Sequence, residues 1–240
     1  MTGSLVVVGT GIGAARLTAE ARAAIAAADQ VLHLIPDPIS TRAVEQLNAR
    51  SRSLGDCYVE GEHRRAAYAR MVDAILEPVR AGERVCAAFY GHPGVFSLPP
   101  HEAIKQARSE GFEAMMLPGI SAEDCLFADL GVDPAEAGCQ SYEATRFLER
   151  RPAIEPRAAL ILWQIGVVGS ANHSAEFQAP RLPELIERLR ELYSDEHEVV
   201  VYEASSFVGV APLIRPRPLV GLAAAVTPAS TLYVPPLAEP

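Results

Sequence analysis

The sequence lacks the features by which several classes of protein are recognised. Its four cysteines lie far apart, at Cys57, Cys86, Cys125 and Cys139, with no C-x-x-C pair and no histidine pair nearby. This spacing signals neither a metal site nor a disulfide framework, so we expect no metal and reduced thiols. With 240 residues, the chain can form one large domain or two domains of about half its length.

Long apolar runs and an excess of positive charge are also missing. No apolar run approaches the roughly 20 residues of a membrane span, and the first residues, MTGSLVVVG, do not have the composition of a signal peptide. The formal net charge is −9, with no stripe rich in lysine or arginine, whereas phosphate contacts require a basic footprint. We therefore expect a soluble cytoplasmic protein with no nucleic-acid or membrane partner, and a ligand that is a small molecule or a neutral peptide.

Strand and helix patterns alternate along the chain. Strands are expected at residues 4–8, 30–35, 54–59, 85–90, 113–117, 158–164, 199–203 and 231–234. Helices are expected at 14–28, 40–49, 62–81, 99–110 and 182–193, with one more that opens at Ser121. Such alternation predicts a mainly parallel α/β sheet. We expect two α/β lobes, residues 1–117 and 118–240, with long loops over 167–180 and 207–218.

Gly9, Gly11 and Gly13 follow the first expected strand in the order GTGIGA. This order matches the G-x-G-x-x-G/A fingerprint of dinucleotide-binding folds. The fingerprint also requires an acidic residue at the end of the second strand, but Asp29 comes before that strand and Asp37 follows a proline beyond it. Dinucleotide binding is therefore the weaker interpretation, and the glycines can equally serve a close turn between strand and helix.

A second loop, FYGHPGVFS over residues 89–97, follows an apolar strand. Gly91 and Gly94 remove side chains that would hold a ligand away from the backbone, and aromatic residues flank them. The mixture is typical of the floor of a ligand pocket, and a tight turn is the alternative interpretation.

Three segments together resemble the tetrapyrrole methylase superfamily of S-adenosylmethionine-dependent enzymes. They are GTGIG, YGHPGVFS and PGISAEDCLFADLG, and the resemblance runs on to the terminal STLYVPP. In detail, FYGHPGVF, MLPGISAEDCLFADLGVDP and a later YEA are similar to the borosin peptide backbone α-N-methyltransferases. The resemblance implies two α/β lobes of the tetrapyrrole methylase type, S-adenosylmethionine in the cleft between them, and a homodimer.

The resemblance also implies which residues line the cofactor. A sulfonium cofactor needs apolar or aromatic walls, backbone groups and few formal charges, which these loops offer. His92 could instead be a turn residue, and Gln164 a polar strand end satisfied by the backbone. The residues expected at the cofactor are Gly9, Gly11, Gly13, Tyr90, His92, Val95, Phe96, Ser121, Ala122, Gln164, Ser230 and Thr231.

The candidate catalytic residues begin with Arg64 and Tyr68, which are four apart in a helical stretch and so share one face. A guanidinium beside a tyrosine lowers the pKa of its hydroxyl, which is otherwise about 10. This pair and the upstream Tyr58 resemble the borosin catalytic arrangement. We expect Tyr68 to remove the amide proton, Arg64 to hold the developing imidate, and Tyr58 to donate to the same oxygen with Tyr90 nearby. Arg65 could take the place of Arg64, and surface packing of the pair is the alternative.

The expected substrate is a separate precursor peptide. Fused borosin enzymes carry their substrate on a long carboxy-terminal extension, whereas this sequence stops at PPLAEP, so we expect a stand-alone, split enzyme that methylates a peptide iteratively. One alternative is a tetrapyrrole C-methyltransferase, whose acidic macrocycle would favour a more basic cleft. Another is a catalytically silent module that only binds the precursor.

Overall fold

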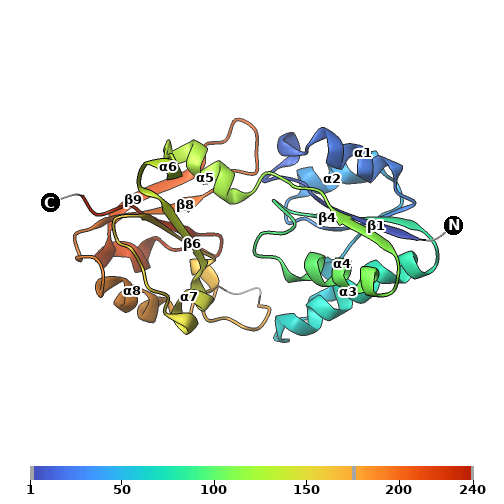
Figure 1. Ribbon diagram of the computed structural model, residues 1–240. Helices are drawn as coiled ribbons and strands as arrows, with labels where there is room; N and C mark the ends of the chain where they lie inside the picture. Colours follow the sequence, from blue (N-terminus) through green and yellow to red (C-terminus); the bar gives the residue numbers. More distant parts are fainter. Residues whose placement is uncertain (1–2, 175–176, 239–240) are drawn as a thin grey trace. The chain divides into compact units, whose positions relative to one another are not determined.

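The computed structural model describes residues 3–174 and 177–238, and they form two compact units. The first unit comprises the residues up to Cys125 together with 205–210, and the second comprises 126–204 and the residues from 211 onward (Figure 1). The sequence prediction divided the chain after residue 117 and did not include the return of 205–210 to the first unit. Each unit contains its own sheet and is described separately.

The first unit is built on a parallel sheet of five strands in the order β3-β2-β4-β1-β5. Its strands are β1 (Ser4–Gly9), β2 (Gln30–Leu34), β3 (Ser51–Ser53), β4 (Arg84–Phe89) and β5 (Glu113–Met116). Its helices are α1 (Ala19–Ala27), α2 (Pro38–Leu47), α3 (Arg64–Arg80) and α4 (Leu98–Ser109), with short 3-10 turns η1 (Ala14–Arg16) and η2 (Gly55–Cys57).

The two faces of this sheet are covered by different helices (Figure 1). Alternate residues of β4 point to opposite faces. Val85, Ala87 and Phe89 belong to the hydrophobic cluster that includes α3 and α4, whereas Cys86 and Ala88 belong to the cluster that includes α1 and α2. Both faces are therefore buried, as is usual for parallel sheets.

The second unit is built on a mixed sheet in the order β6-β7-β10-β8-β9. Its strands are β6 (Cys139–Glu143), β7 (Ala159–Trp163), β8 (Glu198–Glu203), β9 (Leu213–Pro218) and β10 (Thr231–Val234), and only β6 and β7 pair in parallel among them. Its helical segments are α6 (Pro134–Ala137), α7 (Ala144–Arg150), η3 (Ile165–Val167), α8 (Leu182–Arg190) and η4 (Leu219–Ala225), and α5 (Ala122–Leu130) crosses the division between units. Leu182, Leu185, Ile186 and Leu189 form the apolar stripe of α8 that packs on the core.

Three local predictions are wrong. The helix expected at 14–28 begins at Ala19, because Thr18 caps it by accepting a hydrogen bond from the Ala21 amide at 3.1 Å. The strand expected at 54–59 lies at Ser51–Ser53 instead, and Gly55–Cys57 form a 3-10 turn. Residues 213–218, expected in a long loop, form the edge strand β9, which tolerates its two prolines because an edge strand leaves some amides unpaired.

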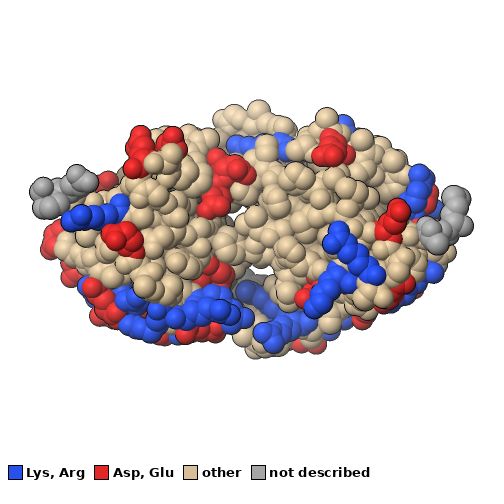
Figure 2. All heavy atoms as spheres, viewed as in Figure 1, with Lys and Arg blue, Asp and Glu red and all other residues tan. Residues whose placement is uncertain are grey.

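Oppositely charged side chains pair over the surface. Figure 2 shows acidic and basic groups side by side on the face in view, and Arg50–Glu83, Arg80–Glu110 and Arg151–Glu191 are examples of ion pairs. Exposed pairs of this kind contribute little to stability individually. Within the part of the chain that the structure describes, no helix has the length and apolar character needed to span a bilayer.

Candidate functional site

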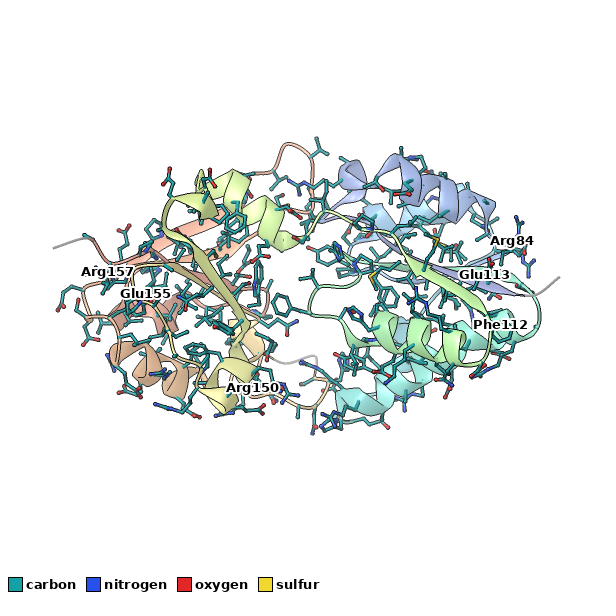
Figure 3. All side chains as sticks on the ribbon, viewed as in Figure 1. Arg84, Phe112, Glu113, Arg150, Glu155 and Arg157 are labelled. Carbon is teal, nitrogen blue, oxygen red and sulfur yellow. The ribbon has the colours of Figure 1, made fainter. Side chains whose placement is uncertain are left out.

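Three loops converge at the carboxyl edge of the first unit's sheet, where β1, β4 and β5 end. A Cβ atom added at Gly9 would lie 2.3 Å from the carbonyl oxygen of Gly91 and 2.9 Å from the Cα of Gly119. No side chain fits there, so glycine is needed for the three loops to meet. Figure 3 shows Arg84 and Glu113, the first residues of β4 and β5, at the opposite edge of the sheet.

The other glycines expected at the cofactor also pack against the chain itself. Gly11 and Gly91 exchange backbone hydrogen bonds of 3.2 and 2.9 Å, and both have a positive φ. A Cβ at Gly13 would lie 2.3 Å from the carbonyl oxygen of Ser206. Close backbone packing thus accounts for glycine at Gly9, Gly11 and Gly13, and their contact with a cofactor stays a prediction.

The loop after β4 presents apolar side chains on its outer side. His92 accepts a hydrogen bond through Nδ1 from the Gly94 amide at 3.0 Å, which ties the turn together. Val95 is 36% exposed and Phe96 is 44% exposed, and Phe96 has a φ of 51°. A non-glycine residue in the left-handed region is uncommon and is often found at functional sites.

Ser121 and Ala122 lie at the start of α5, after the loop that follows β5. The Ser121 hydroxyl donates to Asp124 Oδ2 at 2.7 Å and accepts from the Asp124 amide at 3.2 Å, while the Ser121 amide donates to the same carboxylate. This reciprocal arrangement is a capping box. The hydroxyl of Ser121 is thus held by the helix end, and the sequence spacing S-A-E-D contained that signal.

The hydroxyl of Tyr90 has surroundings of its own. The Ser206 side chain forms a hydrogen bond with its hydroxyl, and the charges of Asp37 and Arg16 also act on it. Burial raises the pKa of Tyr90, and the Ser206 hydrogen bond acts in the opposite direction. Asp37 caps α2, on the face of the sheet opposite α3.

Tyr58, Arg64 and Tyr68 lie together on the α3 side of the sheet. The rings of Tyr58 and Tyr68 meet edge to face with centroids 6.4 Å apart, and their hydroxyls share a hydrogen bond. Burial, followed by the neighbouring Tyr68, raises the pKa of Tyr58 to about 12, while the charge of Arg64 lowers it. Burial and the neighbouring Tyr68 therefore favour the protonated form of Tyr58.

Tyr68 also lines a groove of about 380 Å³ between α3 and α4. Ala69 and Val72 of α3 and Leu98 and Pro99 of α4 give the groove an apolar floor, and Arg65 lies at its rim. Arg64 and Arg65 therefore face different surroundings, since Arg64 acts on Tyr58 and Arg65 borders the groove.

The remaining predicted cofactor residues belong to the second unit. Gln164 is exposed, directly follows β7 and has a φ of 60°. Ser230 is fully buried, donates to Glu203 Oε1 at 2.9 Å and accepts from the Thr227 amide at 2.8 Å. Thr231 is buried in β10 opposite Tyr202. The Ser230 hydroxyl thus belongs to a polar network whose other members, Glu203 and Thr227, the sequence prediction missed.

Other polar groups at the carboxyl edge of the first sheet also escaped prediction. Ser206 lies between the strand expected at 199–203 and the loop expected at 207–218 and was assigned to neither, and Asp37 was considered only as a ribose-binding acid. Asp37 Oδ1 accepts from the Ser40 amide at 2.7 Å, and its Oδ2 has no partner among the described residues. An N-cap aspartate before Pro38 is a recognisable signal for the capping role. No group of three or more potential metal-ligating side chains occurs in the described ranges.

Comparison with known proteins places this geometry in a family. Residues 4–208 match the family model described as Tetrapyrrole (Corrin/Porphyrin) Methylases. The chain is 40% identical, over 99% of its length, to the methyltransferase/ribosomally synthesized cyclic peptide dendrothelin A precursor of Dendrothele bispora. It is 39% identical, again over 99% of its length, to the corresponding omphalotin A precursor of Omphalotus olearius. The chain spans 58% of the length of each of these relatives.

Solved structures of other methyltransferases share the fold. Uroporphyrin-III-C-methyltransferase from Thermus thermophilus matches with a TM-score of 0.68 and 21% identity, covering 98% of this chain and 93% of that one. The cobalt precorrin-4 methyltransferase CbiF matches with a TM-score of 0.69 and 16% identity, covering 97% of this chain and 94% of that one. The predicted fold class is confirmed, and the chain belongs to the tetrapyrrole (corrin/porphyrin) methylase family of methyltransferases.

Proposed function

We propose that this chain methylates backbone amide nitrogens of a peptide, with S-adenosylmethionine as the methyl donor. The observation that carries the proposal is the hydrogen-bonded pair of Tyr58 and Tyr68 with the positive charge of Arg64 beside it. The names of the relatives support a peptide substrate, because each describes a methyltransferase joined to a cyclic peptide precursor. The identity to these relatives is about twice that to the tetrapyrrole methyltransferase structures, which support the fold alone.

An amide nitrogen is a poor nucleophile because its lone pair is delocalised into the carbonyl group. Methylation therefore requires a base for the N–H proton and donors for the charge that moves to oxygen. The deprotonated Tyr68 oxygen takes the proton, and it later returns that proton to solvent. Arg64 holds the negative oxygen of the imidate by charge. Tyr58 keeps its own proton and stabilises the charged Tyr68 oxygen through the hydrogen bond that it donates.

The residues at the carboxyl edge of the first sheet fit a sulfonium cofactor. When bound, S-adenosylmethionine supplies an electrophilic methyl group, which leaves sulfur as the new bond to nitrogen forms. Val95 and Phe96 offer exposed apolar surface for the neutral parts of the cofactor, and the glycine-shaped loops keep backbone groups near it. We infer that Tyr90, His92 and Ala122 contribute to this surface in the first unit.

The test of the proposed function is the conservative variant Tyr68→Phe, which removes the proposed base and retains the ring. We expect the rate of peptide methylation, followed by mass spectrometry in steps of one methyl group, to fall about 10²- to 10⁴-fold. The affinity for S-adenosylmethionine, measured by calorimetry, should remain unchanged. Normal turnover by the variant would remove Tyr68 from this role.

Two further measurements separate the remaining alternatives. Arg64→Lys should slow methylation more than Arg65→Lys, because only Arg64 is assigned to the imidate oxygen. Methylation of a porphyrinogen, with the peptide left unmodified, would contradict the peptide proposal. Absence of cofactor binding would favour a silent peptide-binding module.

We also propose that the peptide can be supplied as a separate chain and that the enzyme acts as a homodimer. The peptide substrate is supported by the names of the relatives, which join a methyltransferase to a cyclic peptide precursor, and the homodimer is what the sequence resemblance implies. The methylation assay tests the first, because the peptide is added in trans. Sedimentation velocity across a range of protein concentrations tests the second, and a monomer throughout would contradict it.

A further inference from the structure

The groove between α3 and α4 follows one face of each helix. Arg65, Ala69, Val72 and Asp73 recur on α3 at the spacing of successive turns, and Leu98, Glu102 and Gln106 do so on α4. Both helices begin at the carboxyl edge of the sheet, so the groove runs from that edge along the helices. Its α3 wall, from Arg65 to Asp73, is about 12 Å long at a rise of about 1.5 Å per residue.

The floor of the groove is apolar and partly exposed. Leu98 is 46% exposed, although it begins a helix whose following residues Pro99 and Pro100 are buried. Ala69 presents only a methyl group at the middle of the α3 wall and leaves room above it. Such a channel accommodates an extended chain with small or branched apolar side chains.

Charges at the two ends of the groove have opposite signs. Arg65 borders the end near the carboxyl edge, and Asp73 and Glu102 border the groove farther along. The neighbouring arginines are occupied, since Arg70 pairs with Glu62 and Arg80 with Glu110. By contrast, none of Arg65, Asp73 and Glu102 forms an ion pair with another described residue, although the charge of Asp73 acts on Arg80. All three side chains are exposed, so their charges can reach a ligand in the groove.

Tyr68 connects the groove to the proposed chemistry, because its ring lines the groove and its hydroxyl is hydrogen-bonded to that of Tyr58. Asp73 is five residues farther along α3, which is about 7.5 Å at the helical rise. An extended peptide advances about 3.3 Å per residue. A side chain that reaches Asp73 and Glu102 therefore belongs to a residue about two positions from an amide that lies at Tyr68.

We propose, on the basis of the proposed function, that this groove binds the part of the substrate peptide that flanks the methylated amide. It selects an extended apolar segment with a basic side chain about two residues from that amide. Asp73 and Glu102 bind the basic side chain, and the apolar floor holds the residue between. Neither acid takes part in the methyl transfer, so both determine substrate preference through binding.

The experiment compares short valine-rich peptides that differ at a single position. That position lies two residues before or two residues after the methylated residue, and it carries Lys, Ala or Glu. The test variant is the double substitution Asp73→Asn with Glu102→Gln. The matched control is Glu113→Gln with Glu198→Gln, which removes the same charge from exposed strand ends outside the groove. KM and kcat come from mass spectrometry, and Kd comes from the fluorescence anisotropy of the same peptides carrying a label.

With the wild-type protein, we expect the Lys peptide to have a KM and a Kd about 3- to 10-fold lower than those of the Ala peptide. The test variant should remove this difference and leave kcat unchanged, whereas the control variant should retain it. Substitution of both acids by Lys should make the Glu peptide the tighter ligand.

The two proposals fail in different ways. Methylation of peptides with no dependence on Asp73 and Glu102 would overturn the groove proposal and leave the proposed function intact. Charge-selective peptide binding without any methylation would support the groove and contradict the proposed function. A change in self-association of the Asp73→Asn, Glu102→Gln variant, with peptide Kd unaffected, would show that a second copy covers the groove and would overturn the proposal.

Discussion

At the scale of single residues, the hydroxyl groups divide into those held by the protein and those open to a ligand. Ser121 is engaged by Asp124, and Ser230 by Glu203 and the Thr227 amide. Tyr68, by contrast, shares a hydrogen bond with Tyr58 and also lines a groove. The hydroxyls of the two serines are therefore engaged by the protein itself, whereas the ring of Tyr68 faces a groove in which a ligand could lie.

The raised pKa of Tyr58 predicts how stability responds to alkaline pH. Its pKa is about 12 in the folded protein and about 10 in an unfolded chain. Between these values the folded state holds a proton that the unfolded state has released, so the free energy of unfolding falls as the pH rises. The slope from this group is at most about 1.4 kcal/mol per pH unit.

Urea denaturation between about pH 9 and about pH 11 measures this slope. The Tyr58→Phe variant lacks the ionisation, so its stability should fall less steeply than that of the wild-type protein. The other titrating groups are common to both proteins and cancel in the comparison. Identical slopes would contradict the buried position of the Tyr58 hydroxyl.

At the scale of helices and strands, the sequence predicted those elements that have a clear apolar period. The strand at β4 and the helices at α3 and α4 were predicted to within two residues at each end. The first residue of α1 was not predicted correctly. The alanine-rich stretch before it itself favours helix, whereas capping by Thr18 makes the helix begin at Ala19. Strand β9 was missed because its prolines are read locally as a break, whereas pairing with β8 makes it a strand.

The same distinction between local and long-range information applies to the candidate site. Arg64 and Tyr68 could be paired from their spacing on one helix. The hydrogen bond of Tyr90 with Ser206 depends on packing over the whole first unit, because the two residues lie far apart in the sequence. The return of Ser206 to Gly13 joins residues far apart in the chain, and no local pattern indicates it.

The start of α5 provides a prediction about a single element. Asp124→Ala removes the carboxylate that accepts from both the amide and the hydroxyl of Ser121. We expect the free energy of unfolding to fall by about 1 kcal/mol. Glu123→Ala is the matched control, since it removes an acid from the same helical turn and leaves the capping box in place. Equal losses from the two variants in urea denaturation would show that only the helix dipole matters there.

At the scale of the whole molecule, each unit has its own hydrophobic core. Phe147 is fully buried in the core of the second unit, and Phe112 packs against a core of the first. Residues 205–210 lie between second-unit segments in the sequence but belong to the first unit. Arg16 Nη1 donates to the Ser205 carbonyl at 2.8 Å, and Gly13 packs against Ser206. The stability of this segment should therefore follow the first unit.

Hydrogen exchange on two core variants tests this division. Phe147→Ala should cost about 3–5 kcal/mol and speed amide exchange in β7 and β10, with β1 and β4 protected as before. Phe112→Ala should speed amide exchange in β1 and β4. Because Arg16 and Gly13 contact residues 205–210, exchange of the amides in that segment should become faster too. If 205–210 responded to Phe147→Ala instead, the segment would be part of the second core. Equal loss of protection throughout the chain in both variants would mean that the two units unfold as one cooperative structure.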